Sequence, residues 1–394
     1  MGELPLEGVV VVSLEQAVAA PYATRQLADL GARVIKIERP GAGDFARGYD
    51  TTVLGQSSYF AWLNRSKESL TLDLKSENGR EVLHRLLAGA DIFVQNLGPG
   101  AVARMGLGVD RLAQRYPTVI PCGISGYGGD GPWQSRKAYD LLVQAEAGLL
   151  SVTGSDADIA KAGISVADIA AGSFAFSGIL TALYTRATTG RVRAVSVSLF
   201  EALVEWMGSP LYYARYGGTA PVRTGARHAT IAPYGPFTAG DGGTVLLAVQ
   251  NDREWQRLCA EVLERPQLIT DPRFATNPGR VAHRDELESI IAAVTNSLTT
   301  QALIARLESA AIATARINDM TQVWEHPVLA ARDRWRQVDT PGGDIRALLP
   351  PAALDGVEPR MDPVPAVGAH TEAVLRELGF SAAEIQRFRS AGTI

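Results

Sequence analysis

The only acidic residue in a long apolar stretch is Asp168. From Gly163 to Gly190 the chain reads GISVADIAAGSFAFSGILTALYTRATTG. The spacing of its large side chains predicts a helix that is apolar on most of its circumference, and therefore buried, and that ends at Gly190. Asp168 has two possible roles. It could cap its own helix, or it could be a covalent nucleophile that the positive helix end keeps ionised and that the small residues 170–173 leave open to a substrate.

The elements that must hold this helix begin with a β-α-β unit. Residues 8–14 and 34–38 are β-branched runs that predict parallel strands, and 21–30 predicts the helix between them. Further strands are expected at 91–95, 118–124 and 193–199, which together indicate a Rossmann-like parallel sheet. The turn after the first strand, 15–20, contains no glycine, so we expect no dinucleotide site there. The glycine pattern at 126–131 is followed by Pro132-Trp133, not by a helix start, and is not expected to bind a dinucleotide either.

Composition narrows the class of protein. The chain has 394 residues, of which 46% are hydrophobic, a net charge of −4 and two cysteines. This length predicts two domains or more, and the charge does not favour a nucleic-acid partner. Two cysteines form neither a disulfide framework nor a cysteine-type zinc site, and no metal site is expected. The N-terminus lacks a basic region and no apolar run reaches about 20 residues, so we expect neither a signal peptide nor a membrane span, and a cytoplasmic location.

The predicted fold class is α/β, with a Rossmann-like large domain and a smaller α+β domain. The tract 207–240 is rich in Gly, Pro, Tyr and Arg and is expected to be irregular, so we place the domain crossing there. The predicted boundaries are 1–215 for the first part of the large domain, 216–325 for the small domain, and 326–394 for a return segment that completes the large domain.

Several segments carry a specific resemblance. They are IERPGAGDFAR at 37–47, NRSKESLTLDL at 64–74, NLGPGAVARMGLG at 96–108, KAYDLLVQA at 137–145, the run 166–190, and APYGPF at 232–237. Together they span nearly the whole chain and resemble the family III CoA-transferases, the family of formyl-CoA and carnitine CoA-transferases. The resemblance implies an interlocked homodimer, in which each chain threads through a ring made by the other.

The resemblance also implies the roles of individual residues. Asp168 would carry acyl and CoA groups as covalent intermediates. Coenzyme A would be a substrate, with no tightly bound cofactor, and its contacts would be Gln16, Ala17, Arg39, Leu72, Asn96, Arg104, Met105, Lys137 and Tyr139. Backbone N–H groups near Gln16 and Ala17 are expected to stabilise the reaction's oxyanions. Asp140 is expected to be a helix cap and not the nucleophile.

A cluster of cations suggests the acceptor. Arg223, Arg227 and His228 precede the APYGPF segment, and Arg47 and Tyr49 lie in the first domain. A fixed arginine binds a second substrate carboxylate well, so we expect a small dicarboxylate as acceptor and succinyl-CoA as donor. The alternative is that these residues are solvated or tie the two domains together, and the sequence does not distinguish the two.

The sequence is also similar to proteins of another function, and a function without catalysis is a further alternative. The α-methylacyl-CoA racemases resemble this chain and share the aspartate, but they place a histidine where this chain has Tyr139. A tyrosine, with an ordinary pKa of about 10, transfers protons poorly at neutral pH. A non-catalytic CoA-binding protein is the second alternative, and the intact motif around Asp168 argues against it. The chain also lacks the run of glycines that forms an active-site loop in some relatives.

Overall fold

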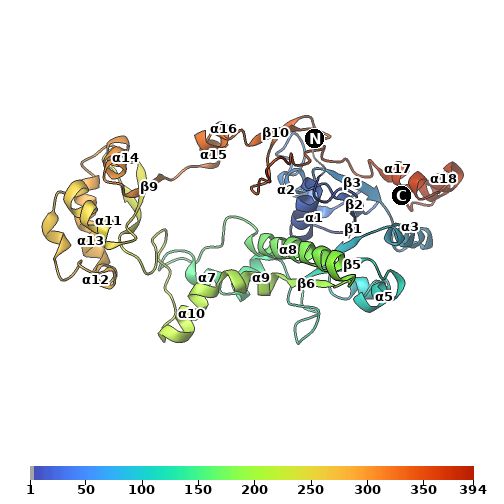
Figure 1. Cartoon of the computed structure of the whole chain (residues 1–394), viewed down its shortest axis with the longest axis horizontal. Helices are drawn as coiled ribbons and strands as arrows, with labels where there is room; N and C mark the ends of the chain where they lie inside the picture. Colours follow the sequence, from blue (N-terminus) through green and yellow to red (C-terminus); the bar gives the residue numbers. More distant parts are fainter. Residues whose placement is uncertain (1–3) are drawn as a thin grey trace. The chain divides into compact units, whose positions relative to one another are not determined.

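The computed structural model describes residues 4–394, which form two compact units (Figure 1). The large unit consists of the chain up to Gly148, Ala162–Ser209 and Arg332–Ile394. The small unit consists of Leu149–Lys161 and Pro210–Ala331. The chain crosses into the small unit after Ser209 and leaves it after Ala331, and it also makes a short excursion at 149–161 that the sequence did not suggest.

The large unit is built on a six-stranded parallel sheet with the order β3-β2-β1-β4-β5-β6. This order is that of a Rossmann fold, and the predicted α/β class is confirmed. Val11, Val12 and Leu14 of β1 are buried because helices cover both faces of the sheet. The strands are β1 (Val10–Leu14), β2 (Arg33–Glu38), β3 (Lys67–Thr71), β4 (Ile92–Gln95), β5 (Ile120–Ser125) and β6 (Val195–Ser198).

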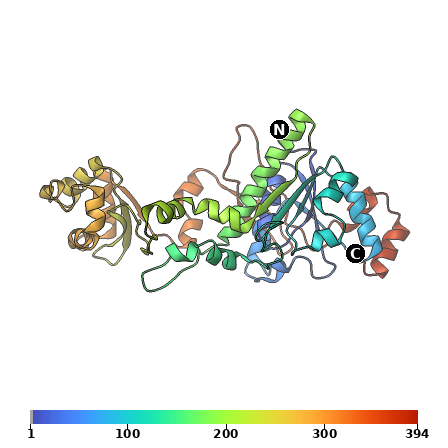
Figure 2. The ribbon, with the colours of Figure 1, turned by 90° about the horizontal axis from the view of Figure 1, so that it is seen from below.

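Helices form a layer on each side of this sheet. One face carries α1 (Ala19–Asp29) and α8 (Val166–Thr189), which pack against each other. The other face carries α3 (Glu77–Ala88), α5 (Val109–Arg115), α17 (Thr371–Glu377) and α18 (Ala382–Ser390), whose apolar side chains share one core with the strands. Figure 2 shows α8 in green and the C-terminal helices in red on opposite sides of the strands. The C-terminal segment therefore returns to complete the large unit.

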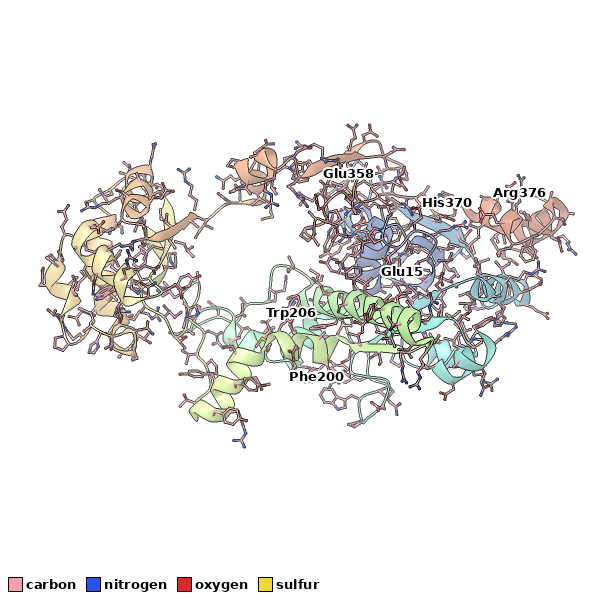
Figure 3. All side chains as sticks on the ribbon, viewed as in Figure 1. Glu15, Phe200, Trp206, Glu358, His370 and Arg376 are labelled. Atoms are coloured by element: carbon pink, nitrogen blue, oxygen red, sulfur yellow. The ribbon has the colours of Figure 1, made fainter. Side chains whose placement is uncertain are left out.

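Shorter elements surround the strand ends. His370, labelled in Figure 3, accepts a hydrogen bond from the backbone N–H of Ser69 through Nδ1 at 3.2 Å and so ties the start of α17 to β3. The remaining elements of the large unit are η1 (Phe45–Gly48), α2 (Ser58–Leu63), α4 (Ala101–Arg104), α6 (Asp140–Glu146), α9 (Leu199–Trp206), and the hairpin of β10 (Trp335–Val338) and β11 (Ile345–Leu348).

The small unit has its own antiparallel sheet and its own core. The strands β7 (Tyr234–Thr238), β8 (Thr244–Ala248) and β9 (Ala313–Arg316) pack on helices around Trp255 and Phe274. The tract 207–240, expected to be irregular, contains both a helix and β7. The other elements are α7 (Leu149–Val152), α10 (Gly208–Gly217), α11 (Asp252–Arg257), η2 (Leu258–Val262), η3 (Pro266–Ile269), α12 (Asn277–Ala282), α13 (Arg284–Thr295), α14 (Thr300–Ser309), α15 (Met320–Trp324) and α16 (Pro327–Ala331).

Helix α8 is less buried than its sequence predicts. It has 24 residues and ends at Gly190, whose φ of 70° is left-handed, so the predicted stop is confirmed. However, Tyr184 is 71% exposed, and most of the helix surface is not buried within this chain. The expectation that no apolar stretch reaches membrane-spanning length is also wrong, because α8 is long and apolar enough by composition. In the fold, α8 packs along the sheet as a core helix does.

Candidate active site

The first turn of α8 is capped from another helix. Asp140, the first residue of α6, accepts hydrogen bonds through Oδ1 from the backbone N–H of Ala167 at 2.8 Å and of Asp168 at 3.3 Å. Ser165 at the N-cap position makes no side-chain bond. Asp168 is therefore not the cap, and Asp140 is a cap of α8 and not of α6, which it begins. Within residues 4–394, the Asp168 carboxylate receives no hydrogen bond.

The surroundings of Asp168 favour its neutral form. Its side chain is half-buried. Burial raises the pKa of Asp168 to about 7, and the negative charge of Asp140 raises it as well. The helix end was expected to keep this carboxylate ionised, but the pKa of Asp168 is raised instead, because the N–H groups of Ala167 and Asp168 donate to Asp140 and not to Asp168. Near neutral pH the side chain exists in both forms, which suits a poorly solvated nucleophile.

The small residues that follow Asp168 serve helix packing. Ala170 and Ala171 are fully buried. A Cβ on Gly172 would lie 2.5 Å from the carbonyl oxygen of Ala19, so only glycine allows α1 this close to α8. The predicted open space over these residues is therefore wrong. Their small size instead brings the turn before α1, residues 15–18, next to the start of the helix that carries Asp168.

That turn is held by two side chains. Asn96 accepts from the backbone N–H of Gln16 at 2.9 Å and donates to its carbonyl oxygen at 2.8 Å. The backbone N–H of Ala17, a residue with a left-handed φ of 60°, donates to Asp44 Oδ1 at 3.2 Å. The N–H groups of Gln16 and Ala17 thus both have partners within the chain, and oxyanion stabilisation by N–H groups near them stays a prediction. Asn96 acts on the turn itself.

A buried charge cluster lies beneath the turn. Lys36 Nζ lies 2.7 Å from Asp44 and 3.5 Å from Glu15, and Lys67 Nζ lies 2.7 Å from Glu15, with all four side chains buried. Burial opposes ionisation of Glu15, yet the charges of Lys67 and Lys36 lower its pKa below the ordinary value. This cluster was not predicted from the sequence, although a lysine in the middle of the apolar strand RVIKIE was a signal for it.

A pocket of about 310 Å³ opens at the carboxyl ends of β1 and β2. Ligands bind at this edge in open α/β sheets. The pocket brings together three residues predicted to bind CoA, namely Gln16, Arg39 and Leu72. It also includes Lys75, which the sequence analysis did not select, although it directly follows the segment NRSKESLTLDL. The two basic side chains are exposed and suit the phosphate groups of CoA.

The other predicted CoA residues are more scattered. Arg104 is exposed and donates to the carbonyl oxygen of Pro99 at 3.4 Å, while Met105 packs partly buried against the large unit's core. Lys137 is exposed, and Tyr139 is 67% exposed next to Asp140. Burial raises the pKa of Tyr49 to about 12, helped by the charges of Asp44, Asp168 and Tyr139. The charge of Asp168 thus acts on Tyr49, and Tyr139 directly precedes Asp140, which caps the helix of Asp168.

Arg47 already has partners in the large unit. Its guanidinium binds both carboxylate oxygens of Glu38, at 2.9 and 2.7 Å, and the carbonyl oxygen of Pro365 at 3.1 Å. It also lies 3.6 Å from the centre of the Phe60 ring. These contacts fix the loop after β2, so a substrate carboxylate would have to compete with Glu38. Its role as a substrate contact stays a prediction.

The predicted acceptor cations lie in the small unit, where each has a local partner. Arg223 donates to the carbonyl oxygens of Ser155 at 2.7 Å and Asp156 at 3.0 Å. Arg227 pairs with Glu288 at 2.7 Å. His228 stacks on Tyr234 with ring centres 5.2 Å apart. A structural role therefore accounts for these contacts, and binding of an acceptor stays a prediction.

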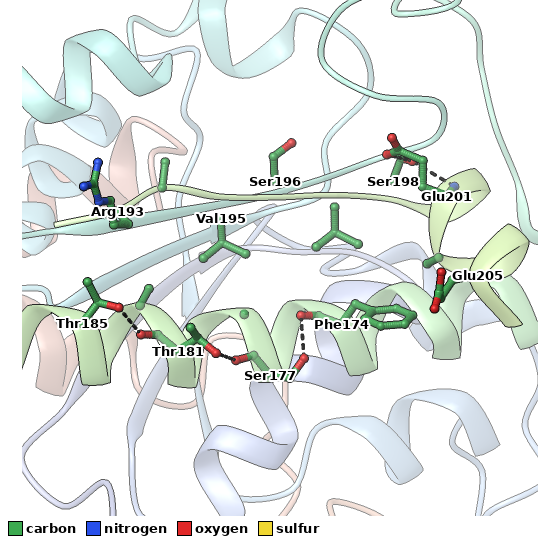
Figure 4. Close-up of a pocket in the computed structure, with 15 residues that line it drawn as sticks. Phe174, Ser177, Thr181, Thr185, Arg193, Val195, Ser196, Ser198, Glu201 and Glu205 are labelled. Atoms are coloured by element: carbon green, nitrogen blue, oxygen red, sulfur yellow. Dashed lines mark hydrogen bonds between the residues drawn. The ribbon is translucent and has the colours of Figure 1, made fainter.

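A larger pocket, of about 670 Å³, lies between α8, the edge strand β6 and α9 (Figure 4). Phe174, Ser177 and Thr181 line its α8 side, and Glu201 accepts a hydrogen bond from Ser198 on the other. It contains none of the predicted site residues, and Arg193 is the one basic residue in its lining. The residues predicted to bind CoA that line a pocket are thus found in the smaller one.

Comparisons with known proteins agree with this geometry. The sequence profile of CoA-transferase family III matches residues 6–371. The chain is 33% identical to mouse succinyl-CoA:glutarate CoA-transferase over 99% of this chain and 90% of the relative. It is 35% identical to acetyl-CoA:oxalate CoA-transferase of Acetobacter aceti over 84% and 85% of the two chains.

A solved structure gives the same result at the level of the fold. A CAIB/BAIF family protein from Brucella suis superimposes with a TM-score of 0.83 and 32% identity, covering 96% of this chain and 100% of the other. The match thus spans both units, the carboxylate on α8 and the basic pocket. This chain belongs to CoA-transferase family III and is an acyl-CoA:carboxylate CoA-transferase.

Proposed function

We propose that this enzyme transfers CoA from succinyl-CoA to a small dicarboxylate, with Asp168 as the covalent carrier. The names of the two relatives support the substrate class, since glutarate and oxalate are both dicarboxylates. The observation that carries the mechanism is the Asp168 carboxylate itself. It is half-buried, receives no hydrogen bond within residues 4–394, and has a raised pKa. A carboxylate in such surroundings loses little solvation when it attacks.

The reaction balances without another reactant. Asp168 attacks the thioester carbonyl, which forms a mixed anhydride and expels CoA thiolate. The thiolate attacks the Asp168 carbonyl, giving an aspartyl-CoA thioester and releasing the donor acid. The acceptor carboxylate then attacks this thioester, forming a second anhydride and freeing the thiolate again. The thiolate attacks the acceptor carbonyl, which yields the new acyl-CoA and regenerates the Asp168 carboxylate.

CoA would bind in the pocket that Arg39 and Lys75 border. Gln16 lines the same pocket, and the helix α1 that follows its turn approaches α8 closely where Ala19 meets Gly172, one turn beyond Asp168. The reactive end of CoA could therefore reach Asp168 while its phosphates stay with the basic side chains. Tyr49, whose raised pKa has the charge of Asp168 among its causes, would contact the acyl group, together with Tyr139, which directly precedes Asp140 in the chain.

We also propose a homodimer located in the cytoplasm. The support for a dimer is a set of large side chains that this chain leaves uncovered. Tyr184 on α8 is exposed, and so are Leu211, Tyr212 and Tyr216 on α10. Apolar surface of this kind is typical of a protein interface.

The mechanism is tested with Asp168→Ala. Transfer should fall by at least about 10³-fold, because no other group in the proposal forms the covalent bond. CoA binding, measured by calorimetry, should change little. A quenched reaction of the wild type should show an acyl or CoA adduct on the peptide that contains Asp168, and the exposed Asp110→Ala should retain both activity and adduct. Turnover of Asp168→Ala within tenfold of the wild type would remove this residue from the mechanism.

The acceptor class is tested with glutarate and with pentanoate, a monoacid of equal length. If Arg223 or Arg227 binds the distal carboxylate, its replacement by alanine should lower kcat/KM selectively for glutarate. The loss of transition-state stabilisation should be about 1.5–3 kcal/mol, as for a charged hydrogen bond. Glu288→Ala is the matched control, because it disrupts the ion pair of Arg227 and leaves the guanidinium in place. Equal losses on both acids would assign these arginines to the structure of the small unit, and wild-type preference for pentanoate would reject the dicarboxylate.

A further inference from the structure

Two aspartates from different helices meet at the start of α8. We propose that Asp140 is a positioning residue for Asp168, which anchors the first turn of α8 and holds a like charge against the nucleophile. This inference rests on the proposed covalent role of Asp168 and adds a second residue to it.

The geometry gives both oxygens of Asp140 a defined task. Oδ1 accepts from the backbone N–H groups of Ala167 and Asp168, at 2.8 and 3.3 Å. Oδ2 accepts from Nε2 of Gln144 at 2.6 Å. With its oxygens occupied in this way, Asp140 is poorly suited to act as base or nucleophile. The carboxylate instead fixes the position of the residue that reacts.

Gln144 extends the same support to the segment before the helix. Its side chain is fully buried one turn along α6. Oε1 accepts from the backbone N–H of Ala162 at 3.0 Å, and Nε2 lies 3.5 Å from the carbonyl oxygen of Ile164. Asp140 and Gln144 together therefore hold the chain from residue 162 to residue 168. Asp168 has little freedom to move relative to α6.

The charge of Asp140 acts on Asp168 from the carboxylate that accepts a hydrogen bond from the backbone N–H of Asp168. Burial and Asp140 are the two causes that raise the pKa of Asp168. Tyr49 faces it as a neutral phenol whose own pKa is raised, with Tyr139 nearby. On the other elements packed against α8, Arg25 pairs with Asp29 on α1, Glu201 accepts from Ser198 at α9, and Glu146 pairs with Arg136 at α6. Glu205 of α9 lines the pocket between that helix and α8.

This arrangement has a direct consequence for the reaction. The anion of Asp168 is repelled by Asp140, whereas its anhydride and its thioester are neutral and are not. The like charge thus destabilises the free carboxylate relative to both covalent intermediates and favours acylation. The same repulsion makes Asp168 take up a proton more readily as the pH falls. A variant that lacks this repulsion should therefore show both a slower acylation and an acid limb that lies at lower pH.

The test removes the charge and keeps a cap. Asp140→Asn and Asp140→Ser both retain an oxygen that can accept from the start of α8. The measurements are kcat/KM for the acyl-CoA between pH 5 and 9, the rate of adduct formation on Asp168, and the thermal midpoint. In both variants the acid limb should move down by about 0.5–1 pH unit, and acylation at pH 8.5 should slow by about 3- to 10-fold.

Controls separate this effect from a loss of stability. Ser381→Ala removes the cap of α18, which lies on the other face of the sheet, and should lower the thermal midpoint without moving the pH profile. A profile that stays within 0.2 pH unit of the wild type in both Asp140 variants would overturn the proposal. If Asp168→Ala is inactive in the same assay, only this inference fails. If Asp168→Ala is active, the covalent role of Asp168 fails as well.

Discussion

At the scale of single residues, the site depends on giving two identical side chains different surroundings. Asp140 receives hydrogen bonds from two backbone N–H groups and from Gln144, whereas Asp168 receives none within residues 4–394. The first carboxylate thus has a donor for each of its oxygens. The second is left with burial and a like charge. Pairs of titratable groups with such divergent surroundings often divide the roles of a reaction.

Stability should depend on pH through Asp168. Its pKa is about 7 in the folded chain and near the ordinary 3.8 when unfolded, so the folded chain binds the proton more tightly between these values. The free energy of unfolding should therefore fall as the pH rises from about 4 to about 7. Asp168→Asn should lack this fall and be more stable than the wild type at pH 8, by about 2 kcal/mol after allowance for partial solvation.

Urea unfolding of both proteins at pH 4.5 and pH 8 measures this difference. The stability gap between variant and wild type should be present at pH 8 and small at pH 4.5. A gap of the same size at both pH values would mean that the ionisation of Asp168 does not destabilise the fold.

At the scale of elements, the turn after β1 is positioned by groups below it. Asp44 connects the N–H of Ala17 to the buried ammonium of Lys36. Asn96, directly after β4, binds both the backbone N–H and the backbone carbonyl oxygen of Gln16. The wall of the pocket proposed to bind CoA is thus fixed by side chains that do not themselves have to touch CoA. Some residues of the family's motifs are placed here as supports.

Lys36→Met should expose this dependence. The substitution leaves the carboxylates of Asp44 and Glu15 with one fewer buried cation, and we expect a loss of about 3–5 kcal/mol in the free energy of unfolding. The KM for acyl-CoA should also rise, because Asp44 no longer holds the turn. Arg376→Met, which breaks an exposed i,i+4 pair with Glu372, should lose less than about 0.5 kcal/mol. Equal, small losses for both variants would show that the cluster is not needed.

The packing of α1 on α8 can be tested through one glycine. A methyl group on Gly172 would meet the backbone oxygen of Ala19 at 2.5 Å, so Gly172→Ala should force the helices apart and destabilise the chain by about 1–3 kcal/mol. The kcat/KM should fall by more than the loss of folded protein explains, because the turn at residues 15–18, which borders the pocket proposed to bind CoA, moves with α1. Gly208→Ala is the control, since a Cβ there meets no atom within 4 Å. Wild-type stability and activity in Gly172→Ala would refute a tight helix contact.

At the scale of the whole molecule, the exposed apolar side chains bear on the solution state. Tyr184 and Tyr216 are 71% and 82% exposed on two different helices. If a second copy covers them, light scattering should give twice the chain mass of 42.0 kDa at micromolar concentration. Tyr184→Glu should weaken the association by placing a charge in the interface. A mass of one chain throughout would contradict the proposed homodimer.

The sequence by itself determined what depends on local pattern. The β-branched runs and glycine stops predicted the parallel sheet and the end of α8, because strand and helix periods are local properties. The motif around Asp168 identified the family for the same reason. The resemblance implied one ligand for Arg39, Gln16 and Leu72, and in the structure they line one pocket at the carboxyl ends of adjacent strands.

Only the tertiary structure decided how these residues are shared between binding and support. Asp140 and Ala167 lie 27 positions apart, and Asn96 and Gln16 lie 80 apart, so no local pattern shows that they bond. The N–H groups expected to serve the oxyanion, and the small residues expected to leave space, proved to be used by side chains and helices from elsewhere in the chain. The electrostatic state of Asp168 likewise depends on burial and on Asp140, which three-dimensional packing alone brings together.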